Sequence, residues 1–166
     1  MTELYILRHA VAESREDWAK SERDRPLTRK GEKEMFRVAK GMKKLDLDFD
    51  LILSSPFARA RRTAEIAVEV LDLERKLRFS DALGADERPE PFIAEARRVF
   101  GSARKVLLVG HEPFLSELIS LFVRGDTAVA IKLKKAGLSK MSLDSIKPGG
   151  GVLEWLLTPG QLLKIG

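Results

Sequence analysis

The chain has 166 residues, 44% of them hydrophobic and 33% charged, which is typical of one globular domain with a full core. Its apolar runs, such as residues 106–109, are far too short to cross a bilayer, and the N-terminal segment predicts no signal peptide. The absence of cysteine excludes disulfides, thiolate metal sites and cysteine nucleophiles. We therefore expect a single domain over residues 1–166, located in the cytoplasm and not bound to a membrane.

The net charge of +5 suggests an anionic partner, either nucleic acid or an anionic substrate. The basic residues are spread along the chain, Asp and Glu are interleaved with most of them, and few aromatic residues lie among them. No platform for stacking single-stranded bases is therefore visible. This pattern disfavours nucleic acid as the partner.

The first third of the chain predicts a strand followed by a helix. Residues 3–8 form an apolar run typical of a buried strand, and residues 11–27 are polar and irregular. Thr28, with Glu32 nearby, is a signal for a helix N-cap, so we expect a helix over residues 29–45. Four apolar residues recur there at helical spacing and are expected in the core: Met35, Phe36, Ala39 and Met42.

The rest of the chain alternates strand and helix patterns in the same way. Strands are expected over residues 49–55, 76–80 and 104–111, and helices over residues 56–71, 91–100 and 113–124, with residues 85–91 as a loop. Pro56 would lie in the first turn of its helix, and Gly125 would close the last one. Residues 138–146 and 151–158 predict two strands joined by a hairpin turn. The alternation predicts an α/β fold, a three-layer α/β/α sandwich with a mostly parallel central sheet.

Both histidines of the chain directly follow a predicted strand. In open α/β sheets, ligands bind beyond the carboxyl ends of the strands. The pairs Arg8–His9, Ser54–Ser55 and Gly110–His111 would therefore gather on one rim of the sheet. A lone histidine at a strand end is more often structural. Two histidines at equivalent positions, with arginines in reach, favour a functional site.

Four segments in this order resemble a known family: LRHA at residues 7–10, RPLTRKGEKE at 25–34, SSPFARARRTAE at 54–65 and LLVGHEP at 107–113. They are similar to the motifs of the histidine phosphatase (phosphoglycerate mutase-like) superfamily. Their spacing is most similar to its SixA-type phosphohistidine phosphatase branch. The resemblance extends from residue 4 to about residue 160. The family usually has Arg-His-Gly at its first motif, and Ala10 replaces that glycine here, which we interpret as a minor departure.

The resemblance implies a role for each matching residue. His9 would be the nucleophile that accepts the phosphoryl group, and Arg8, Arg59 and His111 would surround the phosphate. Arg25 matches an arginine that contributes to the same pocket in the SixA-type branch. The resemblance implies neither a metal nor another cofactor.

The chemistry of phosphoryl transfer agrees with this set of residue types. The transferred group carries charge on three oxygens, so catalysis depends on positioning and electrostatic stabilisation. Arginine keeps its charge and can hold two oxygens at once. An imidazole attacks only when neutral, and nearby arginines favour that form by like-charge repulsion.

Each of these residues also has a plainer interpretation. Arg8 could simply end a strand, and Arg25 could be an ordinary loop cation. Arg61 and Arg62 are alternatives to Arg59, although the family's register favours Arg59; Arg62 would serve a solvated face or the rim of the phosphate site. Ser54 and Ser55 are expected as turn and cap residues, and Thr63 and Glu65 as helix surface or as support behind the site.

The sequence leaves the general acid open. Its carboxylate candidates are Asp81, Asp86, Glu87, Glu90 and Glu112, and nothing in the pattern selects one. An acid helps to expel a poor alkoxide leaving group. The SixA-type branch is expected to manage without a strong acid, because imidazole leaves a phosphoramidate more easily.

These observations predict a metal-independent phosphatase that acts on phosphohistidine in a partner protein. One alternative is a phosphomonoesterase for small molecules that uses one of the candidate carboxylates. Another is a non-catalytic module that binds phosphate or RNA. A metal site built on His9 and His111 is disfavoured, because the arginines on the same rim would repel a cation.

Overall fold

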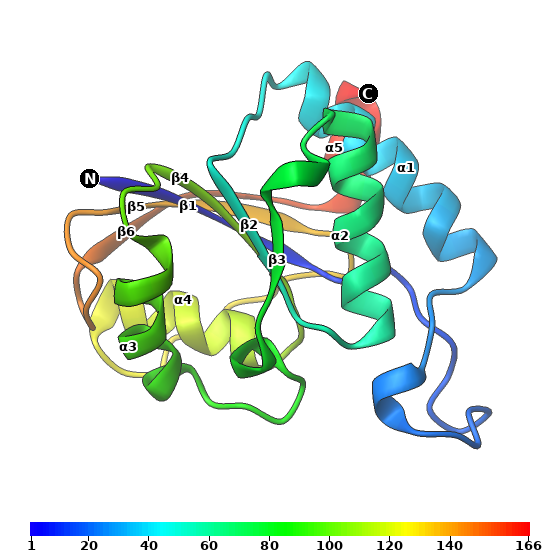
Figure 1. Ribbon diagram of the computed structural model, residues 1–166, viewed down its shortest axis with the longest axis horizontal. Helices are drawn as coiled ribbons and strands as arrows, with labels where there is room; N and C mark the ends of the chain where they lie inside the picture. Colours follow the sequence, from blue (N-terminus) through cyan, green and yellow to red (C-terminus); the bar gives the residue numbers. More distant parts are fainter.

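The computed structural model describes residues 1–166 and has a six-stranded sheet with strand order β3-β2-β4-β1-β5-β6 (Figure 1). The strands are β1 (Thr2–Arg8), β2 (Leu51–Ser54), β3 (Leu77–Phe79), β4 (Lys105–Gly110), β5 (Leu138–Leu143) and β6 (Gly151–Leu157). The α-helices are α1 (Arg29–Lys44), α2 (Ala58–Leu71), α3 (Pro89–Phe100), α4 (Phe114–Arg124) and α5 (Pro159–Ile165). Three short 3-10 turns are η1 (Glu22–Asp24), η2 (Glu74–Lys76) and η3 (Asp81–Leu83).

The central part of the sheet is parallel. Strand β4 pairs in parallel with both β1 and β2, and β2 pairs in parallel with β3. Strand β5 is antiparallel to both β1 and β6, and it is the one strand that runs opposite to the other five. The prediction of a mostly parallel sheet is confirmed, and so is the hairpin that joins the last two strands.

Helices cover both faces of this sheet, as Figure 1 shows. Alternate residues of β1 enter different cores because successive side chains of a strand point to opposite faces. Tyr5 and Leu7 belong to the core beneath α1, α2 and α5, whereas Leu4 and Ile6 belong to the core beneath α3 and α4. The predicted three-layer architecture is therefore confirmed. No helix is long and apolar enough to span a membrane.

Most predicted boundaries hold to within two or three residues. Thr28 caps α1 as predicted, because its hydroxyl accepts a hydrogen bond from the Gly31 N–H at 2.9 Å. The start predicted for α2 is wrong by two residues: the Ser55 hydroxyl accepts the Phe57 N–H at 3.2 Å in a turn that keeps Pro56 outside the helix. Helix α3 begins earlier than predicted, at Pro89, where the missing N–H of proline costs nothing.

The structure also refines the predicted core of α1. Met35, Ala39 and Met42 are fully buried, as expected, whereas Phe36 is only partly buried and packs at the margin of the same cluster. The 3-10 turns and the seven-residue helix α5 were not predicted. Helix α5 packs on α1, where Gly41 faces the main chain of Leu162.

We expect Gly41→Ala to destabilise the protein by about 1–3 kcal/mol, because the added methyl group would overlap the carbonyl oxygen of Leu162. This sign is unusual, since Gly→Ala inside a helix ordinarily stabilises by about 0.5–1 kcal/mol. Urea unfolding measures the effect. Gly160→Ala is the matched control, because its nearest atom would be the Thr158 hydroxyl at 3.9 Å. A Gly41→Ala variant as stable as this control would contradict the close helix contact.

Candidate functional site

The carboxyl ends of three adjacent strands meet at one rim of the sheet. In the β1–β4 ladder Arg8 lies opposite Gly110, so the residues that follow, His9 and His111, are neighbours. Their ring centroids are 5.2 Å apart. Ser55, which follows β2, lies within hydrogen-bond distance of His111 Nε2 at 2.8 Å. The predicted gathering of these strand ends is therefore confirmed.

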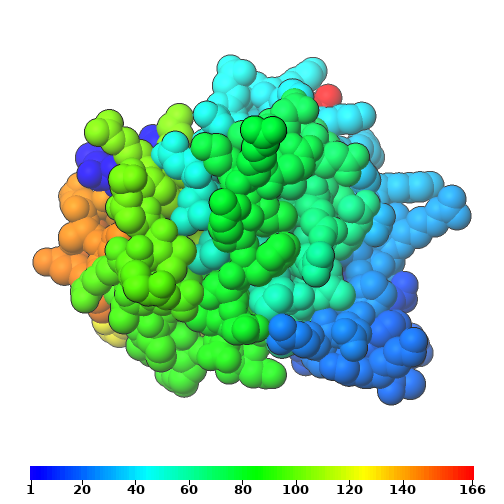
Figure 2. Space-filling model, in the orientation of Figure 1, coloured from blue at the N-terminus to red at the C-terminus, as the bar shows by residue number.

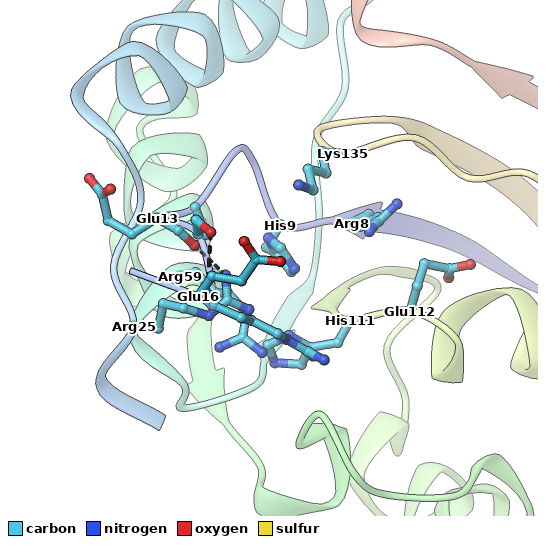
Figure 3. Close-up of a pocket in the computed structure, with 12 residues that line it drawn as sticks. Arg8, His9, Glu13, Glu16, Arg25, Arg59, His111, Glu112 and Lys135 are labelled. Carbon is cyan, nitrogen blue, oxygen red and sulfur yellow. Dashed lines mark hydrogen bonds between the residues drawn. The ribbon is translucent and has the colours of Figure 1, made fainter. Parts of the chain in front are cut away.

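A cavity of about 470 Å³ opens at this rim (Figure 3). All the residues predicted for the site line it: Arg8, His9, Arg25, Arg59 and His111. The segment between β1 and α1 forms one wall, and the turn before β5 forms another. Figure 2 shows the surface of the first segment (dark blue) against the green surface that precedes α3, where Arg23 and Asp81 form an ion pair at 3.2 Å.

Hydrogen bonding fixes the orientation of the His9 ring. Its Nδ1 lies 2.7 Å from the carbonyl oxygen of Ala10. Because a carbonyl oxygen can only accept, the proton is on Nδ1, and Nε2 of the neutral ring carries a free lone pair. His9 is 5% exposed, so this arrangement is almost entirely shielded from solvent.

Thr63 supports the same loop from helix α2. Its hydroxyl accepts the Ala10 N–H at 3.0 Å and donates to the Arg59 carbonyl at 2.7 Å. Thr63 is fully buried and therefore belongs behind the site, whereas Glu65 lies on the surface and pairs with Arg61 at 2.8 Å. Ala10 is also fully buried and packs in the core beneath α1 and α2, so its methyl group leaves the cavity free.

The surroundings keep both imidazoles neutral. Burial lowers the pKa of His9 to about 3, and repulsion from Arg59 and Arg8 acts in the same direction. Burial, followed by repulsion from Arg59, lowers the pKa of His111 to about 2. Burial also lowers the pKa of Arg59 to about 10, which leaves this guanidinium charged at neutral pH.

We expect these two histidines to make the protein less stable as the pH falls from 7 to 5. In the unfolded chain a histidine binds a proton below about pH 6.5, whereas the folded imidazoles stay neutral until about pH 3 or below. The unfolded state therefore binds more protons over this range, and each histidine lowers the free energy of unfolding by about 2 kcal/mol.

Urea unfolding of the wild type and of His111→Gln at pH 7 and pH 5 measures this loss. The variant should lose about half as much stability between the two pH values. Side-chain nitrogen NMR should show neither ring titrating from pH 8 to 5. A titration midpoint near 6.5 for either ring would contradict the buried, neutral state.

The two deepest arginines share one carboxylate that the sequence analysis missed. The Arg25 guanidinium donates to the Glu22 carboxylate at 2.7–3.0 Å. Arg59, which is only 1% exposed, lies 3.2 Å from a Glu22 oxygen and donates to the Glu22 carbonyl at 2.9 Å. Glu22, which does not itself line the cavity, thus orients both cations. The spacing of three residues between Glu22 and Arg25 was the available sequence signal.

The alternatives to Arg59 lie elsewhere. Arg61 is exposed and pairs with Glu65, and Arg62 pairs with Glu32 at 3.1 Å. Neither arginine lines the cavity. Along helix α2, only the first of these three arginines faces inward, because the helical turn carries the other two to the outer side.

Three buried nitrogen atoms of the cavity residues have no hydrogen-bond partner: Arg8 Nε, Arg59 Nε and His111 Nδ1. A buried polar group without a partner costs free energy, typically about 1–3 kcal/mol. The Nη1 of Arg8 has a partner, since it donates to the Leu133 carbonyl at 3.0 Å. The two arginine nitrogens are N–H donors, and His111 Nδ1 is a third donor in the tautomer in which the Ser55 hydroxyl donates to Nε2. An oxyanion offers several acceptor positions at once, so this set of donors fits a phosphate-like group.

Among the five predicted carboxylate candidates, only Glu112 lines the cavity. Burial raises its pKa, and its carboxylate accepts the Ser116 N–H at 2.9 Å. Asp81 pairs with Arg23 outside the cavity, and Glu90 pairs with Arg88 at 3.3 Å. Asp86 and Glu87 do not line it either.

The cavity also contains charged residues that the sequence analysis did not select: Glu13, Arg15, Glu16 and Lys135. They come from loops, where neither strand nor helix periodicity marks the inward side. The structure holds no group of three or more His, Asp or Glu side chains arranged to bind a metal ion.

Comparison with known proteins agrees with this geometry. The family model for the histidine phosphatase superfamily (branch 1) matches residues 4–84, which include most of β1 and all of α1 and α2. An uncharacterised protein from Picosynechococcus sp. is 39% identical over 137 residues, which cover 82% of each chain.

Solved structures share the whole fold. The protein histidine phosphatase SixA, complexed with tungstate, is 25% identical, with a TM-score of 0.84, covering 97% of this chain and 99% of that one. The α-ribazole phosphatase from Shigella flexneri is 18% identical with a TM-score of 0.73, covering 95% of this chain and 97% of that one, and this likeness concerns the fold alone. By its motifs, its fold and these similarities, the chain belongs to the histidine phosphatase superfamily.

Proposed function

We propose that this protein is a phosphohistidine phosphatase that removes the phosphoryl group from a histidine of a partner protein. The observation that carries the proposal is that Arg8, Arg59 and His111 each have a buried nitrogen atom without a partner and line the same cavity as His9, whose Nε2 has a free lone pair. These donors suit the oxygens of a phosphoryl group, and Nε2 suits attack on its phosphorus. The similarity to SixA, whose structure was solved in complex with the oxyanion tungstate, supports the proposal that this cavity binds a phosphoryl group.

In the first step, His9 Nε2 attacks the phosphorus and forms a phosphorus–nitrogen bond as the bond to the leaving group breaks. Arg8, Arg59 and His111 stabilise the charge on the non-bridging oxygens. The imidazole of His9 becomes positive when it carries the phosphoryl group. The Nδ1 hydrogen bond to the Ala10 carbonyl stabilises that charge.

In the second step, water attacks the phosphorus of phosphorylated His9. The phosphorus–nitrogen bond breaks, its electron pair returns to Nε2, and inorganic phosphate leaves. The covalent intermediate replaces one difficult displacement by two easier ones. None of these steps requires a metal ion, because the arginines provide the positive charge.

The leaving group distinguishes the proposed substrate from a phosphate ester. Phosphohistidine expels imidazole, which needs less help from an acid than an alkoxide does. Glu112 is the one predicted acid candidate in the cavity, and its carboxylate already accepts the Ser116 N–H. A substrate whose leaving group needs little help from an acid suits a cavity with this single candidate.

The second candidate function is a small-molecule phosphomonoesterase, and the position of Glu112 is the observation that favours it. Burial raises the pKa of this carboxyl group and so favours its protonated, proton-donating form. Glu112→Gln should then abolish most of the activity on phosphate esters. The same change should have little effect on phosphohistidine.

A substrate panel in the presence of EDTA tests the two functions against each other. A protein phosphorylated on histidine is compared with phosphoserine, sugar phosphates and nucleotides, using the wild type and Glu112→Gln. We expect kcat/KM to be at least about 100-fold higher on phosphohistidine, and unchanged within about threefold in the variant. Preference for an ester together with dependence on Glu112 would overturn the proposal, and loss of activity with EDTA would overturn its metal-free mechanism.

A further inference from the structure

The turn before β5 is hydrogen-bonded to the end of β1 that carries the site residues. The Ala136 N–H lies 3.1 Å from the Arg8 carbonyl and 3.2 Å from the His9 carbonyl. The Arg8 N–H donates to the Gly137 carbonyl at 3.1 Å. The Arg8 guanidinium adds its bond to the Leu133 carbonyl at 3.0 Å. Main-chain and side-chain bonds therefore hold the turn against Arg8 and against the main chain of His9.

The turn is tight and its backbone is strained at one residue. The Gly137 N–H donates to the Lys134 carbonyl at 2.7 Å and closes it. Ala136 has a φ of 58°, in the left-handed region that costs a residue with a side chain about 1–2 kcal/mol. Such strain persists only where the surroundings impose it, and it is concentrated at functional sites. The residue that this turn presents to the cavity is Lys135.

Lys135 carries a charge that the protein does not neutralise. It lines the cavity with Arg8 and His9, and Figure 3 shows its side chain beside His9. It forms neither an ion pair nor a side-chain hydrogen bond, whereas Lys140 in β5 pairs with Glu3 at 3.2 Å and with Glu154 at 2.9 Å. Burial and repulsion from Arg8 and Arg25 lower the pKa of Lys135, in agreement with its place among the cations.

We propose that Lys135 is a further phosphoryl-binding residue, whose ammonium group donates to a non-bridging oxygen of the phosphoryl group held above His9. The inference rests on the proposed function, because it extends the same binding site. A phosphoryl dianion has three non-bridging oxygens, each with more than one acceptor position. The planar guanidinium groups of the arginines can donate only in certain directions. The compact ammonium group of a lysine, on its flexible side chain, can donate to phosphoryl oxygens that the arginines do not contact.

The binding of inorganic phosphate tests this inference without any turnover. Calorimetry at 0.3 M salt compares the wild type with Lys135→Met, Lys135→Arg and Lys134→Met. Lys134 is the matched control, because it is the neighbouring residue in the same turn, is exposed as Lys135 is, carries the same charge and lies outside the cavity. High salt suppresses long-range attraction, which both lysines would share, and leaves direct contacts.

We expect Lys135→Met to weaken phosphate binding by about 10- to 100-fold, as for a lost hydrogen bond to a charged group. Lys135→Arg should retain most of the affinity, and Lys134→Met should change it by less than about twofold. Equal affinities of Lys135→Met and Lys134→Met would overturn the inference. If the wild type binds phosphate but does not hydrolyse phosphohistidine, the proposed substrate fails while the comparison of the lysine variants still decides the role of Lys135.

Discussion

His9→Ala is expected to lower kcat/KM on phosphohistidine by about 10⁴-fold or more and to abolish transfer of a labelled phosphoryl group to the enzyme. The variant lacks the Nε2 lone pair that attacks phosphorus, and no other side chain in the cavity replaces it in the same position. Covalent catalysis loses its whole pathway when its nucleophile is removed. The measurements are steady-state hydrolysis and trapping of the labelled enzyme with an alkaline denaturing quench, because the phosphorus–nitrogen bond of phosphohistidine is cleaved in acid.

His111→Ala is the matched control, because it removes the only other imidazole of the chain. It should reduce the rate but preserve a labelled intermediate, since His9 remains in place. The His9→Ala protein should still bind inorganic phosphate within a few-fold of the wild type, because Arg8, Arg59 and His111 are unchanged. Labelling that persists in His9→Ala and disappears in His111→Ala would reverse the proposed roles of the two histidines.

The position of the site could be predicted from the sequence because it depends on strands. An apolar run followed by a polar residue marks where a strand ends, and the carboxyl ends of parallel strands meet at one rim. This reasoning located His9 and His111 without any coordinates. The helical period of α2 then separates Arg59 from Arg61 and Arg62, although only the resemblance to a family selected it in advance. The catalytic roles of these residues remain predictions.

The site residues that the sequence did not reveal lie on segments without the hydrophobic periodicity of a helix or a strand. Glu22 belongs to a 3-10 turn of three residues, and Lys135 to a loop whose shape depends on hydrogen bonds to Arg8 and His9, more than 120 residues earlier in the chain. Helix α5 is seven residues long and lies where Gly41 permits close packing. Tertiary contacts decide the conformation of the loop with Lys135. Helix α5 also has a local signal that was not used, because Thr158 and Gln161 form a capping box at its start and Pro159 occupies its first turn.

Arg59→Met is expected to lower kcat/KM by about 10²- to 10³-fold, the range typical of a lost donor to the charge of a transition state. Methionine fills much of the buried volume, but it provides neither the charge nor the unpaired Nε donor. Because Arg59 acts on the charge of the phosphoryl group, the loss should appear in kcat as well as in KM. Steady-state kinetics on phosphohistidine measures both.

Two further variants separate this chemistry from a loss of folding. Arg62→Met removes a partly exposed cation from the same helix, one that pairs with Glu32 outside the cavity, and should change kcat/KM by less than about twofold. Arg59→Lys keeps the charge but loses the planar fork that reaches Glu22 and the cavity together, so it should restore only part of the rate. Arg59 is only 1% exposed, and the one carboxylate within ion-pair distance of it, that of Glu22, is shared with Arg25. If Arg59→Met were as active as Arg62→Met, Arg59 would have only a structural role. The phosphoryl group would then have to bind closer to Arg8 and Lys135.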